Sequence, residues 1–335
     1  MVAKIFVPVF LVAFSIAWLL TPVARRLGLK FGFIDMPGPR RKHAEVTSRL
    51  GGVALYTAFM VAIGVTLLLV RRDDPNELRR LGGVLIGCTV VFLLGLWDDK
   101  RELSPAPQLL GQFLAAIIAV RLGLAIEVVT SPFGRPITLS LPLAIAFTLF
   151  WMVGMMNTVN WLDGLDGLAA GVAIIASAIL FWHTFSLRQY SLAVLPLALA
   201  GSAMGFLPYN FHPARVFMGT CGSLVLGFAL ATLAIIGGAK MATTLLVMGI
   251  PILDVAWQIV SRLRSSRSPF RADLGHLHYR LSAWGLSQRQ VVLLFYLFCA
   301  FFGLLALILP SGLYKLYALL GMGGLLLVLI LITCR

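Results

Sequence analysis

Of the 335 residues, 60% are hydrophobic and only 12% are charged, and the mean hydropathy is +0.96. A soluble globular domain is about half apolar and a quarter charged, so this composition excludes an ordinary soluble protein and indicates a bilayer protein. The formal net charge is +14, but basic loops beside membrane spans set topology and contact anionic lipid headgroups, so we expect no nucleic-acid partner.

Apolar stretches recur along the whole chain, and a membrane span needs about 20 such residues. Eleven stretches lie at about 3–24, 50–70, 82–97, 108–124, 139–157, 167–187, 190–208, 222–238, 241–260, 290–309 and 313–333. Two of them, 82–97 and 108–124, are short, so the count is ten or eleven, and we expect eleven. No small-residue cleavage site follows the first stretch, so we interpret it as a retained span and not as a signal peptide. The predicted fold is an all-α membrane protein, a polytopic bundle of about 11 transmembrane helices in a single domain, 1–335.

The loops differ in their content of Lys and Arg, which orients a membrane protein. With the N-terminus outside and the C-terminus cytoplasmic, 17 of the 27 Lys and Arg residues face the cytoplasm. The cytoplasmic loops are then about 25–49, 97–107, 158–166, 209–221 and 261–289. We expect polar chemistry on this face.

The first candidate site is the pair Asp98 and Asp99, at the cytoplasmic end of the third stretch. Two adjacent carboxylates repel each other and are costly to desolvate unless a cation lies nearby. A solvated helix end, neutralised by Lys100 and Arg101, is an equally good interpretation of the pair taken alone.

The second candidate site is the run 157–167, between two apolar stretches. Its polar residues recur at every third position: Asn157, Asn160, Asp163 and Asp166. On a straight α-helix the first and last of these would point in opposite directions. Gly164 and Gly167 allow the chain to turn, so we expect the four side chains to converge on one cavity. Amide and carboxylate oxygens are the hard ligands that Mg²⁺ prefers.

The third candidate site is the segment 208–223, whose small residues open the eighth stretch. Backbone N–H groups at a helix N-terminus can bind a phosphate, and Ser223 is an alternative helix N-cap. Taken alone, this segment is a weak indication of function.

The fourth candidate site lies in the long loop 261–289, where His276 and His278 are two residues apart. A helix would not direct both rings to one point, whereas an extended or turning segment would. Two His without a third ligand make a poor zinc site, and the six arginines of this loop suit phosphate binding better. A basic loop that only sets topology is the alternative.

Asp254 is the one acid that we place well within a span. An intramembrane carboxylate is a functional hypothesis by default. Anchoring a loop arginine such as Arg262 is the alternative role.

Taken together, these motifs resemble the polyprenyl-phosphate N-acetylhexosamine-1-phosphate transferase family, along nearly the whole chain. The matching motifs, in order, are Asp35-Met-Pro with Arg41-Lys42-x-Ala and Arg49-Leu-Gly-Gly, then Asp98-Asp99, then Asn157–Ala169, then Phe217–Ser223, then His276-x-His278. A related branch, the phospho-MurNAc-pentapeptide translocases, carries three consecutive His in the last loop. Here Tyr279 follows His278, which argues against that branch.

The resemblance implies a Mg²⁺-dependent enzyme, with Mn²⁺ as the alternative ion, in the cytoplasmic (inner) membrane of a bacterium. It implies transfer of a sugar 1-phosphate, N-acetylglucosamine 1-phosphate, from a UDP-N-acetylhexosamine to undecaprenyl phosphate, which releases UMP and starts a cell-envelope glycan. A second copy of the chain, forming a homodimer, is the one protein partner that we consider. The catalytic candidates are Asp98, Asp99, Asp163 and Asp166. The substrate-binding candidates are Lys42, Asn157, Asn160, Arg215, Arg271, His276, His278 and Arg280. The metal-binding candidates are Asp99, Asp163, Asp166 and position 220.

The chain departs from the family pattern at Thr220, where the pattern F-M-G-D-x-G-S has a metal-binding Asp. A threonine hydroxyl is a neutral and weaker ligand, so impaired metal binding or inactivity is expected unless a neighbouring acid compensates. A lipid flippase or transporter is the leading alternative class, although such proteins place polar groups near the membrane midplane. A CDP-alcohol phosphotransferase would need an Arg after its Asp-Gly motif, where this chain has Leu168-Ala169-Ala170.

Overall fold

The computed structural model describes residues 3–36, 46–70, 72, 74–238, 240–266 and 275–333. Within them the chain is almost entirely helical. The helices are α1 (Ala3–Phe31), α2 (Gly51–Leu69), α3 (Pro75–Arg101), α4 (Pro105–Arg121), α5 (Leu141–Leu162), α6 (Leu168–Ser186), α7 (Tyr190–Asn210), α8 (Gly219–Ile235), α9 (Met241–Val247), α10 (Gly249–Arg264), α11 (Leu277–Ala283), α12 (Gln288–Ile308) and α13 (Gly312–Thr333). The strands form two antiparallel hairpins, β1 (Ile34–Asp35) with β2 (Thr47–Ser48), and β3 (Val128–Thr130) with β4 (Pro136–Thr138).

In the described residues, eight helices are long and apolar enough to cross a membrane: α1, α2, α3, α5, α6, α7, α12 and α13. A ninth span results if α9 and α10, which meet at a 76° bend, count as one. The all-α polytopic class is thus confirmed. The remaining two expected spans correspond to α4 and α8, each of 17 residues. At 1.5 Å per residue these helices are about 25 Å long, short of a hydrocarbon core of about 30 Å. The count of eleven and the orientation of the termini therefore remain predictions.

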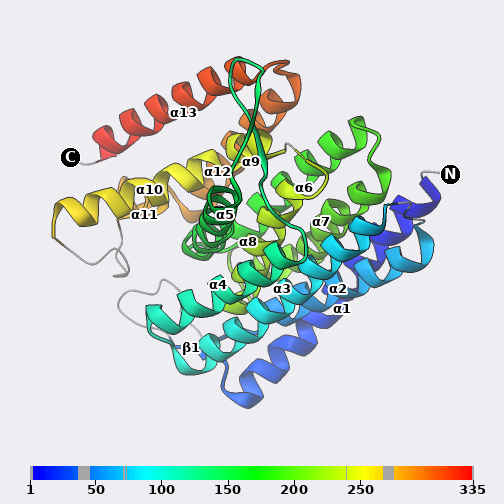
Figure 1. Cartoon of the computed structure of the whole chain (residues 1–335). Helices are drawn as coiled ribbons and strands as arrows, with labels where there is room; N and C mark the ends of the chain where they lie inside the picture. Colours follow the sequence, from blue (N-terminus) through cyan, green and yellow to red (C-terminus); the bar gives the residue numbers. More distant parts are fainter. Residues whose placement is uncertain are drawn as a thin grey trace.

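Helix α8 forms the centre of the bundle, and almost all of its residues are buried. Figure 1 shows it enclosed among the other helices. Glycines bring its neighbours into direct backbone contact, because a Cβ on Gly95 of α3 would lie 2.3 Å from Cα of Cys221. A Cβ on Gly52 of α2 would likewise lie 2.3 Å from the nitrogen of Gly222. Small residues of this kind let membrane helices pack closely, and here they hold the end of α3 against the start of α8.

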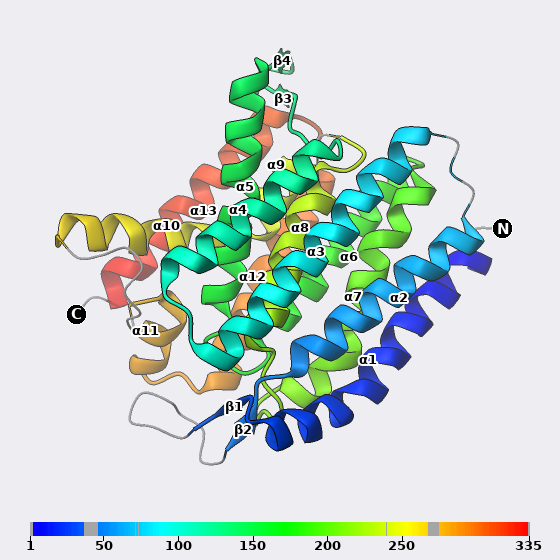
Figure 2. The same ribbon diagram turned by 60° about the horizontal axis from the view of Figure 1, so that its bottom comes forward.

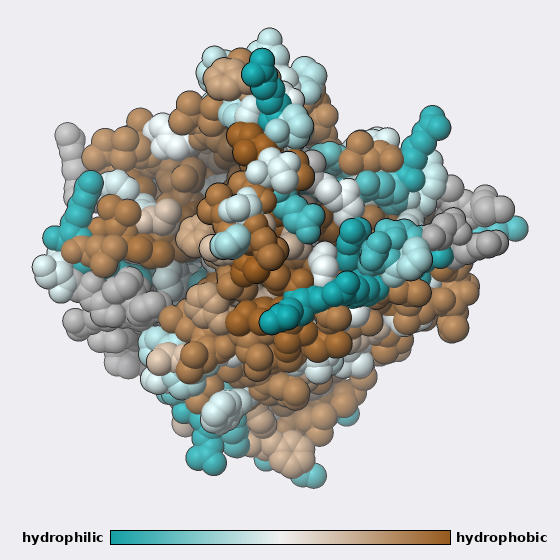
Figure 3. Space-filling view, viewed as in Figure 1, coloured by the Kyte–Doolittle hydropathy of each residue, from teal (hydrophilic) through white to brown (hydrophobic). Residues whose placement is uncertain are grey.

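The outer surface is apolar, as a bilayer requires. Leu68, Phe150 and Ile308 are 86%, 74% and 75% exposed, and the face drawn in Figure 3 is brown over much of its area. An apolar surface of this extent would be unusual on a soluble monomer. The two hairpins mark opposite ends of the molecule, with β1 and β2 at the bottom of Figure 2 and β3 and β4 at the top.

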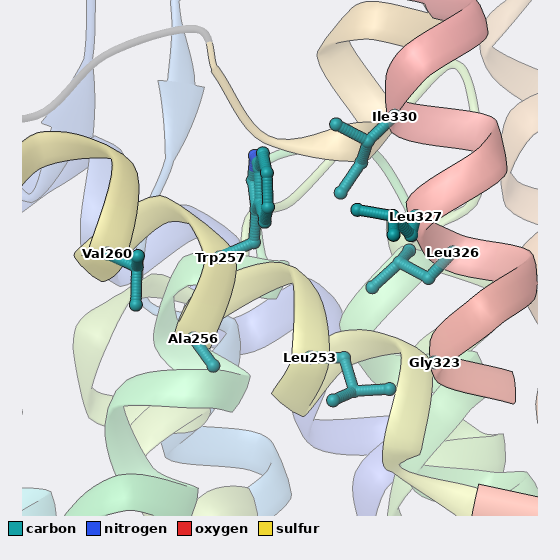
Figure 4. Close-up of a pocket in the computed structure, with 8 residues that line it drawn as sticks. All are labelled: Leu253, Ala256, Trp257, Val260, Gly323, Leu326, Leu327 and Ile330. Atoms are coloured by element: carbon teal, nitrogen blue, oxygen red, sulfur yellow. The ribbon is translucent and has the colours of Figure 1, made fainter. Parts of the chain in front are cut away.

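An apolar pocket of about 230 Å³ lies between α10 and α13 (Figure 4). Its lining contains no acidic or basic side chain and consists of Leu253, Ala256, Trp257, Val260, Gly323, Leu326, Leu327 and Ile330. The carboxylates predicted to carry the chemistry gather elsewhere.

Candidate active site

Asp99 caps the N-terminus of α8. Its Oδ1 accepts the backbone N–H of Thr220 at 2.8 Å, and its Oδ2 accepts that of Cys221 at 3.0 Å. A carboxylate here is favourable because a helix N-terminus carries partial positive charge and unpaired N–H groups. Gly219 permits the close approach, with φ at +71° and space for no Cβ beside Asp99. The prediction that these amides bind a phosphate is wrong for Thr220 and Cys221, whose N–H groups bind Asp99.

Asp98 is held by three donors. Its Oδ1 accepts the backbone N–H of Leu103 at 2.9 Å and the side-chain amide of Gln108 at 2.6 Å, and its Oδ2 accepts the hydroxyl of Thr220 at 2.6 Å. The side chain is also buried. Asp98 and Asp99 therefore bind the α8 turn and the start of α4, and are not a solvated helix end.

The chain turns between α5 and α6 as the glycines predicted. Helix α5 ends at Leu162, and Gly167 has φ at +80°, a conformation that costs glycine little. The turn is fixed from outside, since the Gly167 N–H donates to Asn210 at 3.1 Å and the Gly167 carbonyl accepts the hydroxyl of Tyr296 at 2.5 Å. These contacts set the direction of the two acids that the turn carries.

Asp163, at the start of this turn, faces other acids. Burial raises the pKa of its carboxyl well above the usual range, and the charges of Asp99 and Asp166 raise this pKa further. Among the described residues its carboxylate has no hydrogen-bond donor. Asp163 thus lies within electrostatic range of one acid of α3 and of one acid of its own turn, and the repulsion favours a bound cation.

Asp166 is oriented by the segment that follows α7. Its Oδ2 accepts Nδ1 of His212 at 2.8 Å and the backbone N–H of Ala214 at 3.1 Å. Neither contact is predictable from sequence spacing, because Asp166 and His212 are 46 positions apart. His212 is a site residue that the pattern of spacings alone could not reveal.

The two asparagines of α5 are held by neighbouring helices. The Asn157 amide donates to Gln112 of α4 at 2.6 Å, and Oδ1 of Asn160 accepts the Ser223 hydroxyl of α8 at 2.8 Å. Ser223 therefore does not cap α8, whose N-cap position is Met218. The asparagines thus link α5 to α4 and α8 in the last two turns of α5 before Asp163.

The histidine pair lies at the start of α11, with both rings buried. His276 precedes the helix in an extended conformation, so its ring stacks on that of His278, with centroids 5.6 Å apart and planes 9° apart. His278 also lies against the acid-bearing turn, since a Cβ on Gly164 would be 2.7 Å from its Nε2. Tyr279 follows, and its hydroxyl donates to the Gly164 carbonyl at 3.3 Å. The start of α11 thus packs against the turn between α5 and α6.

Asp254 holds this loop in place. Its carboxylate accepts Nδ1 of His276 and the backbone N–H of Leu277, both at 2.9 Å. The alternative prediction, that Asp254 anchors Arg262, is wrong, because the Asp254 carboxylate binds His276 and Leu277. Arg262 lies over the ring of Trp161, 5.5 Å from its centroid.

The basic candidates are placed around this end. Arg215 is exposed, and its carbonyl accepts Nε of Arg25 at 3.1 Å. Nε of Arg280 donates to the Gly275 carbonyl at 2.6 Å. Lys42 and Arg271 lie outside the described residues. Arg49 of the first loop pairs with Asp35 and with Glu102, at 3.4 Å for the latter.

The donor set can be compared with the needs of Mg²⁺. Within the described ranges, no three His, Cys, Asp or Glu side chains are grouped so as to hold a metal by themselves. Mg²⁺ in phosphate enzymes is usually bound by one or two carboxylates together with substrate phosphates and water. The carboxylate of Asp163 can bind such an ion. So can Oδ1 of Asp166, because both hydrogen bonds to Asp166 use its Oδ2. The residues therefore fit a Mg²⁺ ion that binds with substrate.

Comparisons with known proteins agree with the motifs. Residues 81–238 match the family described as glycosyl transferase family 4. A probable undecaprenyl-phosphate N-acetylglucosaminyl 1-phosphate transferase of Bacillus subtilis is 33% identical over 309 residues, 90% of this chain and 84% of the relative. A decaprenyl-phosphate N-acetylglucosaminephosphotransferase of Mycolicibacterium smegmatis is 35% identical over 321 residues, 86% of this chain and 78% of the relative.

A phospho-N-acetylmuramoyl-pentapeptide-transferase of Staphylococcus epidermidis is also similar, at 30% identity over 310 residues, 89% of this chain and 95% of the relative. With relatives above 30% identity along most of its length, the chain belongs to glycosyl transferase family 4, within the polyprenyl-phosphate N-acetylhexosamine-1-phosphate transferases. The resemblance drawn from the motifs is confirmed.

Proposed function

We propose that this chain transfers N-acetylglucosamine 1-phosphate from UDP-N-acetylglucosamine to undecaprenyl phosphate, on the cytoplasmic face of a bacterial inner membrane. The observation that carries the proposal is the placement of Asp99 near the end of α3 and of Asp163 and Asp166 just after α5, where the charges of the other two acids raise the pKa of Asp163. A transporter would place such groups near the membrane midplane. The names of the relatives support N-acetylglucosamine as the sugar and a polyprenyl phosphate as the acceptor.

The reaction needs little activation of the acceptor. A phosphate monoester has a second pKa near 6, so the lipid phosphate is largely dianionic at neutral pH. One of its oxygens attacks the phosphorus that carries the sugar, a new P–O–P linkage forms, and the bond from that phosphorus to the UMP oxygen breaks. UMP leaves with the electron pair of that bond.

The difficulty is to bring two anionic substrates together beside three acids. Asp163 and Asp166 would hold a Mg²⁺ ion, with Mn²⁺ as the alternative, and the bound ion would neutralise phosphate charge. Asp99 sets the position of α8, and Asp98 holds Thr220 and α4. The exposed Arg215 and the basic last loop provide cations for the phosphates.

The experiment is an assay of UMP release with UDP-N-acetylglucosamine, undecaprenyl phosphate and Mg²⁺. It is run on the purified chain, for which slow release is expected because of Thr220, and on its Thr220→Asp variant. Release should require both substrates and Mg²⁺. The same assay with UDP-N-acetylmuramoyl-pentapeptide tests the other branch, represented by the relative from Staphylococcus epidermidis. Release from that donor alone would assign the chain to that branch. Release from neither donor, by this chain and by its Thr220→Asp variant, would contradict the proposed function.

A further inference from the structure

His212 and Asp166 form a contact that none of the family motifs discussed above includes. Nδ1 of the imidazole lies 2.8 Å from Oδ2 of the carboxylate. With Asp166 ionised, a contact this short requires the proton on Nδ1, so the imidazole is the donor. The Asp166 side chain is 18% exposed and that of His212 is 38% exposed. The pair therefore lies at the open edge of the acid cluster.

Both donors to Asp166 act on the same oxygen. Nδ1 of His212 and the backbone N–H of Ala214 both bind Oδ2, at 2.8 and 3.1 Å. This pair of donors fixes the plane of the carboxyl group and leaves Oδ1 for another partner. Groups that bind a metal-ligating carboxylate in this way orient it, and their loss typically lowers metal affinity about 10–100-fold.

The segment that carries His212 is itself held. Arg289, in the first turn of α12, donates to the His212 carbonyl from Nε at 3.2 Å and from Nη2 at 3.0 Å. Further along, Arg215 N–H donates to the Tyr209 carbonyl at 2.8 Å. The imidazole is therefore presented to Asp166 by a backbone fixed on both sides, and a fixed donor orients its acceptor better than a free one.

We propose that His212 is a positioning residue, which holds Asp166 through Nδ1 so that the other carboxylate oxygen binds a divalent cation. The inference rests on the proposed function only in naming that cation as the one used with substrate. It predicts that the position of the donor atom matters more than the imidazole ring. An Asn amide nitrogen lies at about the reach of Nδ1, and a Gln amide nitrogen at about that of Nε2.

The test is Mn²⁺ binding by the detergent-solubilised full chain, measured by electron paramagnetic resonance of the free ion, with a fixed concentration of UMP to supply the phosphate together with which the ion binds. The variants are His212→Ala, His212→Asn and His212→Gln, each made in the chain as it stands and with Thr220→Asp. His183, whose Nδ1 pairs with Thr243 at 2.8 Å away from the acids, gives the matched control His183→Ala. We expect the Mn²⁺ dissociation constant to rise about 10–100-fold for His212→Ala and His212→Gln. His212→Asn should stay within a few-fold of the parent, and His183→Ala should equal it.

Tight binding by a folded His212→Ala variant would overturn the inference, as would a His212→Gln variant that binds at least as well as His212→Asn. Failure of both parents to bind Mn²⁺ would also overturn it. If His212→Ala does not fold, the Mn²⁺ dissociation constants of His212→Asn and His212→Gln test the inference by themselves. A parent that binds Mn²⁺ in this pattern but releases no UMP would leave the inference standing and contradict the proposed function.

Discussion

Asp254 and His276 form a buried pair that joins α10 to the start of α11, with Oδ2 and Nδ1 2.9 Å apart. Their side chains are 6% and 7% exposed. The second oxygen of Asp254 accepts the N–H of Leu277, so one carboxylate fixes the point where the last loop becomes helical. Because His278 and Tyr279 follow in the first turn of α11 and contact Gly164, this pair determines how α11 packs against the acid-bearing turn.

Replacing Asp254 with Ala should therefore loosen the loop. A buried imidazole and a backbone N–H would lose their acceptor, which costs about 1–3 kcal/mol for each unsatisfied group. We expect a lower thermal midpoint in detergent and a higher KM for the UDP-sugar. Asp254→Asn keeps an oxygen acceptor and should show a smaller effect on both. Equal midpoints for Asp254→Ala and the parent would show that the pair does not hold the loop.

The ionised Asp163 carboxylate should lower the thermal stability of the metal-free protein, although turnover requires it. Its pKa is raised by burial and by the charges of Asp99 and Asp166, so the folded state binds its proton more tightly than the unfolded state does. The ionised carboxylate therefore destabilises the fold increasingly as pH rises through the raised pKa. In metal-free protein, Asp163→Asn should raise the thermal midpoint at neutral pH.

That gain should shrink as pH falls toward the ordinary range of a carboxyl, where the parent is protonated as well. The measurement is the thermal midpoint of both proteins against pH in the presence of a chelator. Metal-dependent turnover should be abolished by the same substitution. A variant less stable than the parent at neutral pH, or one with near-normal turnover, would contradict the assignment of Asp163.

The sequence predicted the placement of the acids at helix ends for a simple reason. Charged residues that interrupt apolar stretches must lie near the membrane surface, and Asp98, Asp163 and Asp166 do lie at the ends of α3 and α5. Gly167 likewise predicted the turn, because its left-handed conformation favours glycine. Local patterns were sufficient for both.

The same reasoning could not assign the partners of these acids. The amides of Thr220 and Cys221 belong to an ordinary helix N-terminus, and only the close approach of α3 at Gly95 delivers Asp99 to them. The contact of Asp166 with His212 likewise depends on how α7 and the following segment pack. The number of membrane spans could not be predicted from the apolar stretches either, because α10 bends away from α9 within one continuous apolar stretch.

The orientation of the chain can be tested by labelling. Phe133, 82% exposed, lies between β3 and β4, and Trp284, 61% exposed, follows α11. Cysteine at position 133 should react with an impermeant maleimide on intact cells, and cysteine at 284 only after lysis. Cys88, Cys221 and Cys299 are buried, so a Cys334→Ser background suffices. Labelling of position 284 on intact cells would reverse the topology.

The last prediction concerns Thr220, the one departure from the family motif in the α8 turn. Its hydroxyl donates to Oδ2 of Asp98 at 2.6 Å, and its N–H donates to Asp99. Position 220 lies in the first turn of α8, where a carboxylate is stabilised by the helix dipole. Without a carboxylate there, we expect the chain to transfer sugar phosphate slowly or not at all, since Mg²⁺ sites in phosphate enzymes rely on only one or two carboxylates.

Thr220→Asp should raise turnover by orders of magnitude and lower the Mg²⁺ concentration needed for half-maximal rate. Thr220→Asn is the matched control, because it has the same size and an oxygen ligand but no charge. The measurement is turnover against Mg²⁺ for all three proteins. An Asn variant as active as the Asp variant would assign the effect to geometry and not to charge. Equal, robust activity of the parent and Thr220→Asp would show that position 220 is not a ligand position, because the acids already present suffice.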